Sequence, residues 1–542
     1  MSLSVACIGG GPGGLFAATL IKQRRPDAQV TVYERNRADD TYGFGVVFSD
    51  ATLKKINDAD PVLIDALREH GTHWEDIEVR LKGERITVGG NGMAAISRKT
   101  LLLLLQDRAR AEGVDLRFES EADVDELLAD HDLVVASDGA NSRARERFAD
   151  QFGPSAVQAS AKFIWFGTSY MFEGLTFVHK EGPHGVFAVH GYPISEDVST
   201  FIVETDEETW RRAGLDQFDV TQPPGPSDEK SRKYLEKLFA DEIDGQPLLV
   251  NNSRWGNFRT RRAASWHAGR VALLGDSAHT AHFSVGSGTK MAMEDAIEFA
   301  RAVAEHDDVE QALAAYEAAA RPSVEKIQGS ARPSLSWWEH FGRYHSAFDP
   351  TQFAFHFMSR SIGRAKIARR DPGFIAAVDA AWRERHGSDP LSTPLDLGDV
   401  VFPGRTARIV ERDGRRFVAD GGGALVPLTE WPAADGARGG HPDVAPAIGR
   451  DEPWALWLAA PDSEDGVAGA AATVAACRAE RPALVAVHGG TPLTRVLLAE
   501  EARLAAGLPV ALVEEQADED RAATLVLSGR ADLVATAGGT GV

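Results

Sequence analysis

The stretch that decides the fold is residues 4–14, which read SVACIGGGPGG. Its apolar first half predicts a strand over Ser4 to Ile8, and the glycines lead into a helical stretch over Leu15 to Gln23. A second strand is expected over Val30 to Tyr33, and it ends at Glu34. This strand–turn–helix–strand order is typical of a fold that binds a dinucleotide.

The glycines of this turn have separate roles in a dinucleotide fingerprint. Gly9 permits the tight turn, Gly11 lets the backbone approach a pyrophosphate, and Gly14 packs the helix on the strand. The pyrophosphate is expected at the positive amino end of the helix. Glu34 follows at about the spacing where an acid accepts hydrogen bonds from a ribose, and we assign Arg35 to the same site. The fingerprint alone does not separate NAD from FAD.

A second motif follows another buried strand. Residues 133–136 are apolar, and residues 138–142 after them read DGANS. An aspartate at such a strand end, here Asp138, can accept a hydrogen bond from a hydroxyl of a cofactor. Taken alone, the motif is equally compatible with an ordinary Asp-Gly turn.

A third motif, GDSAH at residues 275–279, follows a strand expected over Val271 to Leu274. Asp276 can accept from a ribityl hydroxyl, and Gly286 and Gly288 open a helix whose N–H groups and dipole suit the pyrimidine end of a flavin. An aspartate that only caps a helix is the alternative for this motif. The three motifs in this order favour one FAD site assembled from distant segments.

The chain is long enough for several domains, since single cores stop growing near about 250–300 residues. Aromatic and β-branched segments separated by turns predict an antiparallel sheet between Lys162 and Val203. We expect an α/β protein with a discontinuous Rossmann-like FAD-binding domain over residues 1–165 and 255–330. An antiparallel-sheet substrate domain is expected over residues 166–254, and a helical segment over residues 331–388.

The remaining residues, 389–542, predict a small parallel α/β domain. Strands alternate with helices through its last 90 residues or so, with strands expected at 455–459, 483–487, 509–513 and 533–535. The stretch 420–453 is rich in Gly, Pro, Ala and Asp and predicts a loose connection.

The net charge and the cysteine content disfavour several classes of partner and of site. The net charge of −22 disfavours nucleic acid and anionic membrane surfaces. Only Cys7 and Cys477 are present, so neither a disulfide framework nor a metal site is expected. The apolar amino-terminal stretch runs directly into the glycine turn, which is unlike a signal peptide, and we expect a cytoplasmic protein.

On these motifs, residues 1 to about 330 resemble the class A FAD-dependent aromatic hydroxylases, the para-hydroxybenzoate hydroxylase type. The resemblance implies FAD as the cofactor, with O2 and NADH or NADPH as co-substrates. It further implies that Asp138 contributes to FAD and transient NAD(P)H binding, that Asp276 contacts the ribityl chain, and that Arg98 lies near the FAD.

One difference from the usual sequence pattern of the family points to a subgroup within it. Most members carry prolines and a Gly-x-Gly-x-Asn run after the third motif, whereas here proline is absent and Lys290 replaces the Asn. With GFGVVFS at residues 43–49, this is similar to the subgroup of salicylyl-CoA 5-hydroxylases and anthraniloyl-CoA monooxygenases. CoA-ester members often continue into a TIM-barrel flavin reductase, and residues 394–398 and 529–534 resemble its start and end. Too few residues separate them for a full barrel, so we expect a truncated relic.

Other candidate site residues are less specific. Two basic clusters could contact CoA phosphates, although a solvated surface is the alternative for each: Arg254, Arg259, Arg261, Arg262 and Arg270, or Arg360, Arg364, Lys366, Arg369 and Arg370. Five histidines could accept the proton of a ring hydroxyl, and the sequence does not distinguish among them: His179, His184, His190, His279 and His282.

The expected function is therefore an FAD-dependent, NAD(P)H-consuming monooxygenase that hydroxylates an aryl-CoA thioester. The resemblance implies a flavin C4a-hydroperoxide as the oxidant, with salicylyl-CoA converted to gentisyl-CoA as the first choice. An anthraniloyl-CoA monooxygenase and a hydroxylase of free aromatic acids or tryptophan are alternatives in the same class. A flavin-binding scaffold that docks a partner through its C-terminal domain is the alternative of another class.

Overall fold

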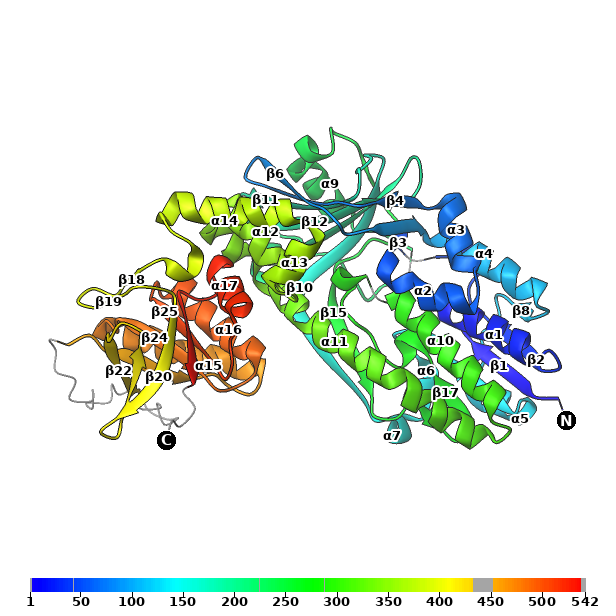
Figure 1. The fold of residues 1–542 in the computed structure, drawn as a ribbon. Coiled ribbons are helices and arrows are strands. Elements are labelled where there is room, and N and C mark those ends of the chain that lie inside the picture. Colours follow the sequence, from blue (N-terminus) through cyan, green and yellow to red (C-terminus); the bar gives the residue numbers. More distant parts are fainter. Residues whose placement is uncertain (1, 42, 224, 287, 432–451, 538–542) are drawn as a thin grey trace. The chain divides into compact units, whose positions relative to one another are not determined.

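The computed structural model describes residues 2–431 and 452–537, apart from residues 42, 224 and 287. It divides into two compact units, Met1–Gly342 and Arg343–Val542, whose elements are labelled in Figure 1. Among the described residues, no helix combines the length and the apolar composition needed to cross a membrane.

A six-stranded sheet forms the core of the first unit. Its order is β16-β17-β9-β1-β2-β8, with bounds His267–Ala268, Val271–Leu273, Leu133–Ala136, Ser4–Ile8, Gln29–Tyr33 and Asp115–Arg117. All neighbours are parallel except β16 and β17. The strands β1, β9 and β17 are apolar and nearly fully buried, as parallel strands covered on both faces are.

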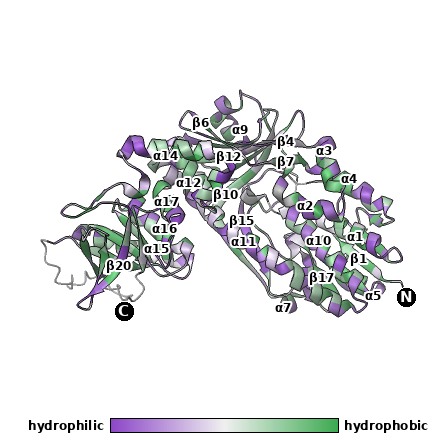
Figure 2. Cartoon of the chain, viewed as in Figure 1, coloured by the Kyte–Doolittle hydropathy of each residue, from purple (hydrophilic) through white to green (hydrophobic). Residues whose placement is uncertain are grey.

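Helix α1 (Pro12–Arg24) lies in the interior of this unit. It packs against α4 (Arg98–Ala111) and α10 (Gly288–Glu305), and its residues from Gly13 to Ile21 are all buried. Figure 2 shows hydrophilic residues on outer helices such as α4, while the inner strands carry the hydrophobic colour. A helix buried on every side keeps the glycine turn at its amino end fixed relative to the sheet.

A second, largely antiparallel sheet follows the order β14-β10-β13-β12-β11-β5-β6. The bounds are Leu248–Leu249, Pro154–Thr168, Ser199–Thr205, Gly185–Pro193, Leu175–Gly182, Ile77–Leu81 and Glu84–Val88. This confirms the antiparallel sheet predicted between Lys162 and Val203. The long strand β10 also pairs with β15 (Gly256–Ala263), and the register between them shifts between Gln158 and Lys162.

The two faces of this sheet differ because side chains alternate along each strand. Ile164 and Phe166 of β10 join a core that includes Leu235 of α9 (Glu229–Leu238). Trp165, between them, belongs to the opposite face, where it packs in another cluster with Tyr192. That second face carries the candidate site.

The remaining elements of the first unit surround these two sheets. A three-stranded sheet has the order β3-β7-β4, with bounds Gly45–Ser49, Met93–Ser97 and Thr72–Trp74. The other helices are α2 (Asp50–Ala59), α3 (Val62–His70), α5 (Val124–Asp130), α6 (Arg143–Arg147), α7 (Ala149–Phe152), α8 (Glu207–Arg212) and α11 (Val309–Ala347), the last of which continues into the second unit.

The second unit contains a closed barrel of seven strands, β20 to β26. Their bounds are Thr406–Arg412, Arg415–Ala419, Leu425–Glu430, Ala455–Ala459, Leu484–His488, Val510–Glu514 and Leu533–Ala537. The strands β20, β21 and β22 pair antiparallel, and the other pairs are parallel. The helices are α12 (Pro350–Met358), α13 (Arg364–Arg370), α14 (Pro372–His386), α15 (Val467–Cys477), α16 (Pro492–Glu500) and α17 (Glu519–Leu527), and the short strands β18 (Leu395–Asp396) and β19 (Val401–Phe402) form a further pair.

The barrel confirms the predicted truncated α/β unit and corrects one detail of it. The stretch 420–453 is not a loose connection throughout, since β22 lies within it. An antiparallel hairpin turns at Asp413 and Gly414, both with positive φ, and leads to β22. Residues 432–451 of the expected connection lie outside the described residues.

Candidate active site

The glycine turn before α1 has the geometry that a bound pyrophosphate requires. Gly9 has a φ of +106°, and a Cβ there would lie 2.4 Å from the carbonyl oxygen of Ser137. A Cβ on Gly14 would lie 2.2 Å from the oxygen of Gly9, whereas one on Gly11 would meet nothing within 4 Å. Helix α1 begins at Pro12 without a side-chain cap or an acid in its first turn. Its amino end therefore presents N–H groups and positive dipole to an anion.

Glu34 is already engaged within the protein. Its Oε2 accepts a hydrogen bond from the N–H of Gly10 at 2.8 Å, and its Oε1 accepts from the backbone and side chain of Asn36 at 2.8 and 2.7 Å. The carboxylate thereby holds the glycine turn, and Oε2 retains a lone pair that a ribose hydroxyl can use. Arg35 is exposed beside it.

Asp138 lies at the end of β9 and faces the start of α6. Its Oδ2 accepts a hydrogen bond from the N–H of Arg143 at 2.8 Å. Its Oδ1 is buried and has no hydrogen-bond partner among the described residues. A buried acceptor without a donor is costly, so this oxygen fits a hydroxyl donor on a bound group.

Arg145 joins the second motif to the third. Its side chain is 4% exposed and donates to the carbonyl oxygens of Ala140 and Ser277, each at 2.8 Å. Since Ala140 follows β9 and Ser277 follows β17, one guanidinium fixes both loops at the carboxyl edge of the sheet. Ligands bind at this edge in open α/β sheets.

Asp276 is held in place by a buried pair behind it. Asp295 of α10 accepts the N–H of Gly275 at 3.0 Å, and its Oδ2 also lies 2.7 Å from Nε2 of His279. Asp276 itself is exposed, although the protein around it raises the pKa of its carboxyl by desolvation. Water that reaches the carboxylate from the solvent side offsets this desolvation. Asp276 can therefore meet a ligand from the solvent side.

Arg98 is close enough to interact electrostatically with Asp276. Its guanidinium lies over the ring of Trp165, 5.2 Å from the centroid, and Nε donates to the carbonyl of Gly45 at 3.3 Å. Desolvation lowers the pKa of this arginine, and the charges of Tyr192 and Asp276 oppose that shift. The cation thus lies close to the third motif and to the second sheet.

The glycines after the third motif leave the start of α10 open. Gly286 has a φ of +61°, and a Cβ there would lie 3.4 Å from Val47. A Cβ on Gly288, the first residue of α10, would meet nothing within 4 Å. Lys290 is paired with Glu294 at 2.8 Å on the same helix, so it does not replace the family's Asn as a free polar group.

The candidate histidines separate into different environments. His184 lies near Tyr234, His179 is buried and stacks on Trp338, and His279 is paired with Asp295. His190 and His282 both face Glu204. Sequence reasoning missed Glu204 and Asp295, which gain their meaning only from contacts across the fold.

The first basic cluster is only partly brought together. Arg254 and Arg270 donate to backbone carbonyls of separate loops, and Arg262 donates to Gln328. Arg145 and Arg259 both lie near Arg261, since desolvation and then the positive charges of Arg145 and Arg259 lower the pKa of the Arg261 guanidinium. These three cations lie near the second motif, where Arg261 donates to Asn141 at 3.2 Å.

The second basic cluster lies in the other unit. Arg364 is paired with Asp379 there, and Arg360 donates to the carbonyl of Phe357 at 2.7 Å. Lys366, Arg369 and Arg370 are exposed.

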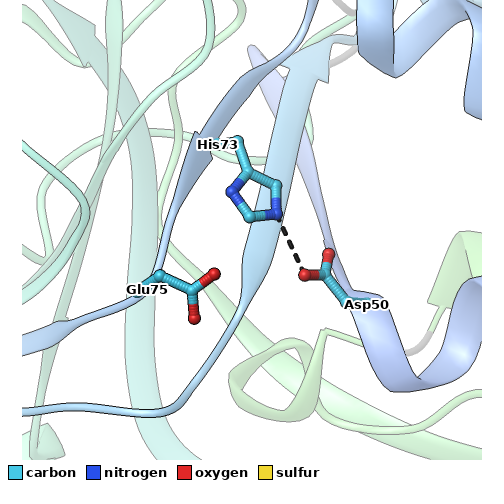
Figure 3. A group of neighbouring side chains, drawn as sticks. All are labelled: Asp50, His73 and Glu75. Carbon is cyan, nitrogen blue, oxygen red and sulfur yellow. Dashed lines mark hydrogen bonds and ion pairs between the residues drawn. The ribbon is translucent and has the colours of Figure 1, made fainter.

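Although the sequence indicated no metal site, three exposed ligand-type side chains do meet in the first unit. They are Asp50, His73 and Glu75, whose ligand atoms lie within 4.8 Å of one another (Figure 3). His73 Nε2 is 2.9 Å from Asp50 Oδ2. All three groups are open to water, and the His–Asp pair already accounts for their proximity.

Comparison with known proteins agrees with this geometry. Residues 2–331 match the family model described as FAD binding domain. The crystal structure of a mutant 2-methyl-3-hydroxypyridine-5-carboxylic acid oxygenase superposes with a TM-score of 0.51 at 21% identity, covering 67% of this chain and 99% of that chain, and it supports the fold alone. The chain belongs to the family of FAD-dependent monooxygenases that carry this FAD-binding domain.

Two curated relatives resemble the chain over different lengths. A salicyloyl-CoA 5-hydroxylase from a Streptomyces species is 59% identical over 99% of this chain and 100% of its own length. A 3-hydroxy-4-methyl-anthranilyl-[aryl-carrier protein] 5-monooxygenase from Streptosporangium sibiricum is 39% identical over 61% of this chain and 87% of its own. The first match therefore spans both units, whereas the second covers 331 residues of the chain.

The residues present fit FAD. The open space over Gly11, the unpartnered Oδ1 of Asp138, the exposed carboxylate of Asp276 and the open amino end of α10 offer complementary groups to the pyrophosphate, the hydroxyls and the ring of a flavin dinucleotide.

Proposed function

We propose that this protein hydroxylates the ring of an aryl-CoA thioester. The substrate is salicylyl-CoA, called salicyl-CoA below, and the product is 5-hydroxysalicyl-CoA, which is gentisyl-CoA. The observation that carries the proposal is the 59% identity to a salicyloyl-CoA 5-hydroxylase over both units and both full lengths. The reaction consumes O2, NAD(P)H and one proton, and it releases NAD(P)+ and water.

We assign different parts of the cofactor to different site residues. We assign the FAD dinucleotide to Gly9, Gly11, Gly14, Glu34 and Arg35, and the ribityl and ring portion to Arg98, Asp138, Asp276, Gly286 and Gly288. Bound FAD supplies the transfer of electrons from NAD(P)H to O2. The protein contributes position and exclusion of water, because the sheet face beside Arg98 is lined by aromatic side chains.

The thioester carrier is the common element of the two curated relatives. Both CoA and aryl-carrier proteins present an acyl group on phosphopantetheine, so we assign the first unit to recognition of an aromatic acyl thioester. The exposed Arg259, with Arg261, offers cations to a CoA phosphate in an otherwise acidic protein. The free, buried Cys7 and Cys477 support the proposed cytoplasmic location.

The test is NADH and NADPH oxidation by the FAD-loaded protein with and without salicyl-CoA, followed by mass analysis of the product. We expect strong stimulation and a product one oxygen atom heavier than the substrate. Turnover with free salicylate, anthranilate or tryptophan but not with the thioester would overturn the CoA assignment and keep the enzyme class.

An anthraniloyl-type substrate is the second candidate, favoured by the 39% identity to the anthranilyl-carrier monooxygenase over 61% of this chain. Anthraniloyl-CoA assayed in parallel with salicyl-CoA distinguishes the two. A kcat/KM for anthraniloyl-CoA above that for salicyl-CoA would replace the first assignment by the second.

A further inference from the structure

A buried carboxylate with two imidazoles lies on the sheet face that carries the candidate site. Glu204 of β13 has 1% of its surface exposed, and His190 of β12 and His282 have 4% and 2%. His190 Nε2 lies 2.6 Å from Glu204 Oε1, and His282 Nε2 lies 3.7 Å from Glu204 Oε2. The contact with His190 has the distance of an ion pair without the alignment of a hydrogen bond.

The contacts of His282 determine which of its nitrogens carries the proton. Nδ1 lies 3.3 Å from the backbone N–H of Ser284 and 2.7 Å from the Ser284 hydroxyl, and both of these groups can donate. Nδ1 is therefore the acceptor, and the proton of the neutral ring is on Nε2, which faces Glu204. This is the arrangement in which a carboxylate orients an imidazole and stabilises it after it gains a second proton.

Ser284 extends the chain of polar groups out of the interior. It is half-buried in the short turn Phe283–Val285, and its hydroxyl also lies 2.9 Å from that of Ser334. When Ser284 donates to His282, Ser334 must donate to Ser284, which leaves one acceptor position on the Ser284 oxygen. That position is available to a hydroxyl of a bound molecule.

The same turn adjoins the aromatic face of the site. Phe283 packs against Phe163 at 5.1 Å and Trp165 at 6.1 Å between ring centroids, and the guanidinium of Arg98 lies over the ring of Trp165. His190 is also 5.5 Å from the Phe283 ring. The carboxylate and its histidines thus lie directly behind the side chains that line the sheet face.

We propose that His282 accepts the proton of the substrate's ring hydroxyl through the Ser284 hydroxyl, with Glu204 as the positioning residue and His190 holding Glu204 from its other side. This rests on the proposed function and assigns the base that the sequence left open. The O–H bond of the ring hydroxyl breaks and its electron pair stays on the ring oxygen. Ser284 receives that proton and passes its own to His282 Nδ1, which forms the new N–H bond. The ring, now richer in electrons, is the better nucleophile at the carbon para to its oxygen.

The first test measures binding without turnover. Salicyl-CoA is added to the oxidised, FAD-loaded protein in the absence of NADH, and the phenolate absorption band of the bound ring is recorded. We expect the band with the natural protein, a loss of it in His282→Gln, and a reduced band in Glu204→Gln. His267→Gln is the matched control, because its partner Glu317 at 2.8 Å forms a half-buried His–Glu pair outside the site, and it should keep the band.

The second test measures turnover. We expect His282→Gln to lower kcat by roughly 100-fold, within the usual range for loss of a general base, with a KM within about threefold of the natural value. A 3-fluoro analogue of salicyl-CoA, whose hydroxyl is more acidic, should restore much of the lost rate in this variant and change the natural protein little. If His282→Gln fails to retain FAD, Ser284→Ala removes only the transferring hydroxyl and should show the same loss and the same rescue.

The outcomes of these tests distinguish a failure of the proposed proton path from a failure of the proposed function. A natural protein that hydroxylates salicyl-CoA, with variants that keep both the phenolate band and kcat, would overturn the proton path alone. A natural protein that gives neither the band nor a hydroxylated product with salicyl-CoA would overturn the proposed function on which it rests.

Discussion

Two buried carboxylates, one in each unit, have opposite surroundings. Glu204 of the first unit faces the imidazoles of His190 and His282. Glu500 of the second unit lies 3.4 Å from the guanidinium of Arg343 and 3.7 Å from that of Arg530, as well as 3.2 Å from Nε2 of His356. Imidazoles gain and lose protons near neutral pH, whereas guanidinium groups stay charged.

The difference teaches what each carboxylate is suited to do. Interactions with His356 and the two arginines outweigh desolvation and lower the pKa of Glu500 to about 2, which keeps it ionised. Tyr344 also donates its hydroxyl to Glu500, so the end of α11, α12 and α16 are joined through one fixed charge. Glu204 instead shares its surroundings with groups whose protons can move, which suits proton transfer rather than structural support.

The largest expected effect comes from removing the fixed charge. Glu500→Gln leaves Arg343 and Arg530 without their buried counter-ion, and breaking such a pair typically costs about 3–5 kcal/mol. Hydrogen exchange of the full-length protein should show faster exchange in peptides of residues 343–537. Glu501→Gln, next to it and less buried, is the control and should change exchange little. Unchanged protection in Glu500→Gln would contradict the structural role.

The next largest effect is expected from acid, which should lower the stability of the second unit. Desolvation and Arg530 lower the pKa of His356 from 6.5 to about 3, and that of Glu500 falls from 4.5 to about 2. The unfolded chain thus binds more protons than the folded one between about pH 6.5 and 2, so stability is complete above this window and is lost as pH falls through it. From pH 6.5 to 5 we expect a loss of about 2 kcal/mol, mainly from His356.

The measurement is hydrogen exchange of residues 343–537 at several pH values, corrected for the intrinsic pH dependence of exchange. His356→Gln should flatten the upper part of this dependence. A second unit that gains stability on acidification would show that the folded-state pKa values lie above those of the unfolded chain.

An effect of intermediate size is expected from changing a third buried carboxylate, Asp295. It accepts the N–H of Gly275 and contacts His279, so Asp295→Ala leaves a buried donor unsatisfied and releases the turn that presents Asp276. Loss of such a bond costs about 1–3 kcal/mol, which predicts roughly 10- to 100-fold weaker FAD binding. Flavin fluorescence titration measures it. Asp295→Asn keeps an oxygen acceptor and should lose less affinity than the alanine variant.

The smallest effect is expected at an ion pair within one helix. Lys290 and Glu294 are four residues apart on α10, and such helix pairs contribute about 0.2–0.5 kcal/mol. Lys290→Asn, which introduces the residue usual in the wider family, should leave thermal unfolding and FAD affinity almost unchanged. A large loss of FAD affinity would show that Lys290 contacts the cofactor.

Local signals in the sequence predicted much of the fold. The bounds expected for β1, β9 and β23 agree with the structure because each element is a short apolar run between clear breaks. The antiparallel hairpin of the barrel was missed, since its strands are rich in Arg and Glu and their apolar faces meet only inside the barrel.

The candidate site was predictable in its glycines and aspartates, which form compact motifs. Its supporting residues were not, because Glu204 and Asp295 are ordinary acids in the sequence. Glu204 becomes distinctive only when β13 places it beside His190 and the turn at His282 closes over it. Whether the assigned residues hold FAD remains a prediction that the binding experiments address.

The strand β10 sets a fixed spacing between two groups of candidate site residues. Its first residues pair with β15, which carries Arg259 and Arg261, and its last residues carry Phe163 and Trp165. Inserting or deleting one residue after the irregularity at Gln158 would turn Trp165 to the opposite side of the sheet, since side chains alternate. A change of length in this part of the strand therefore keeps Trp165 on the face that carries the candidate site only when it comes in steps of two residues.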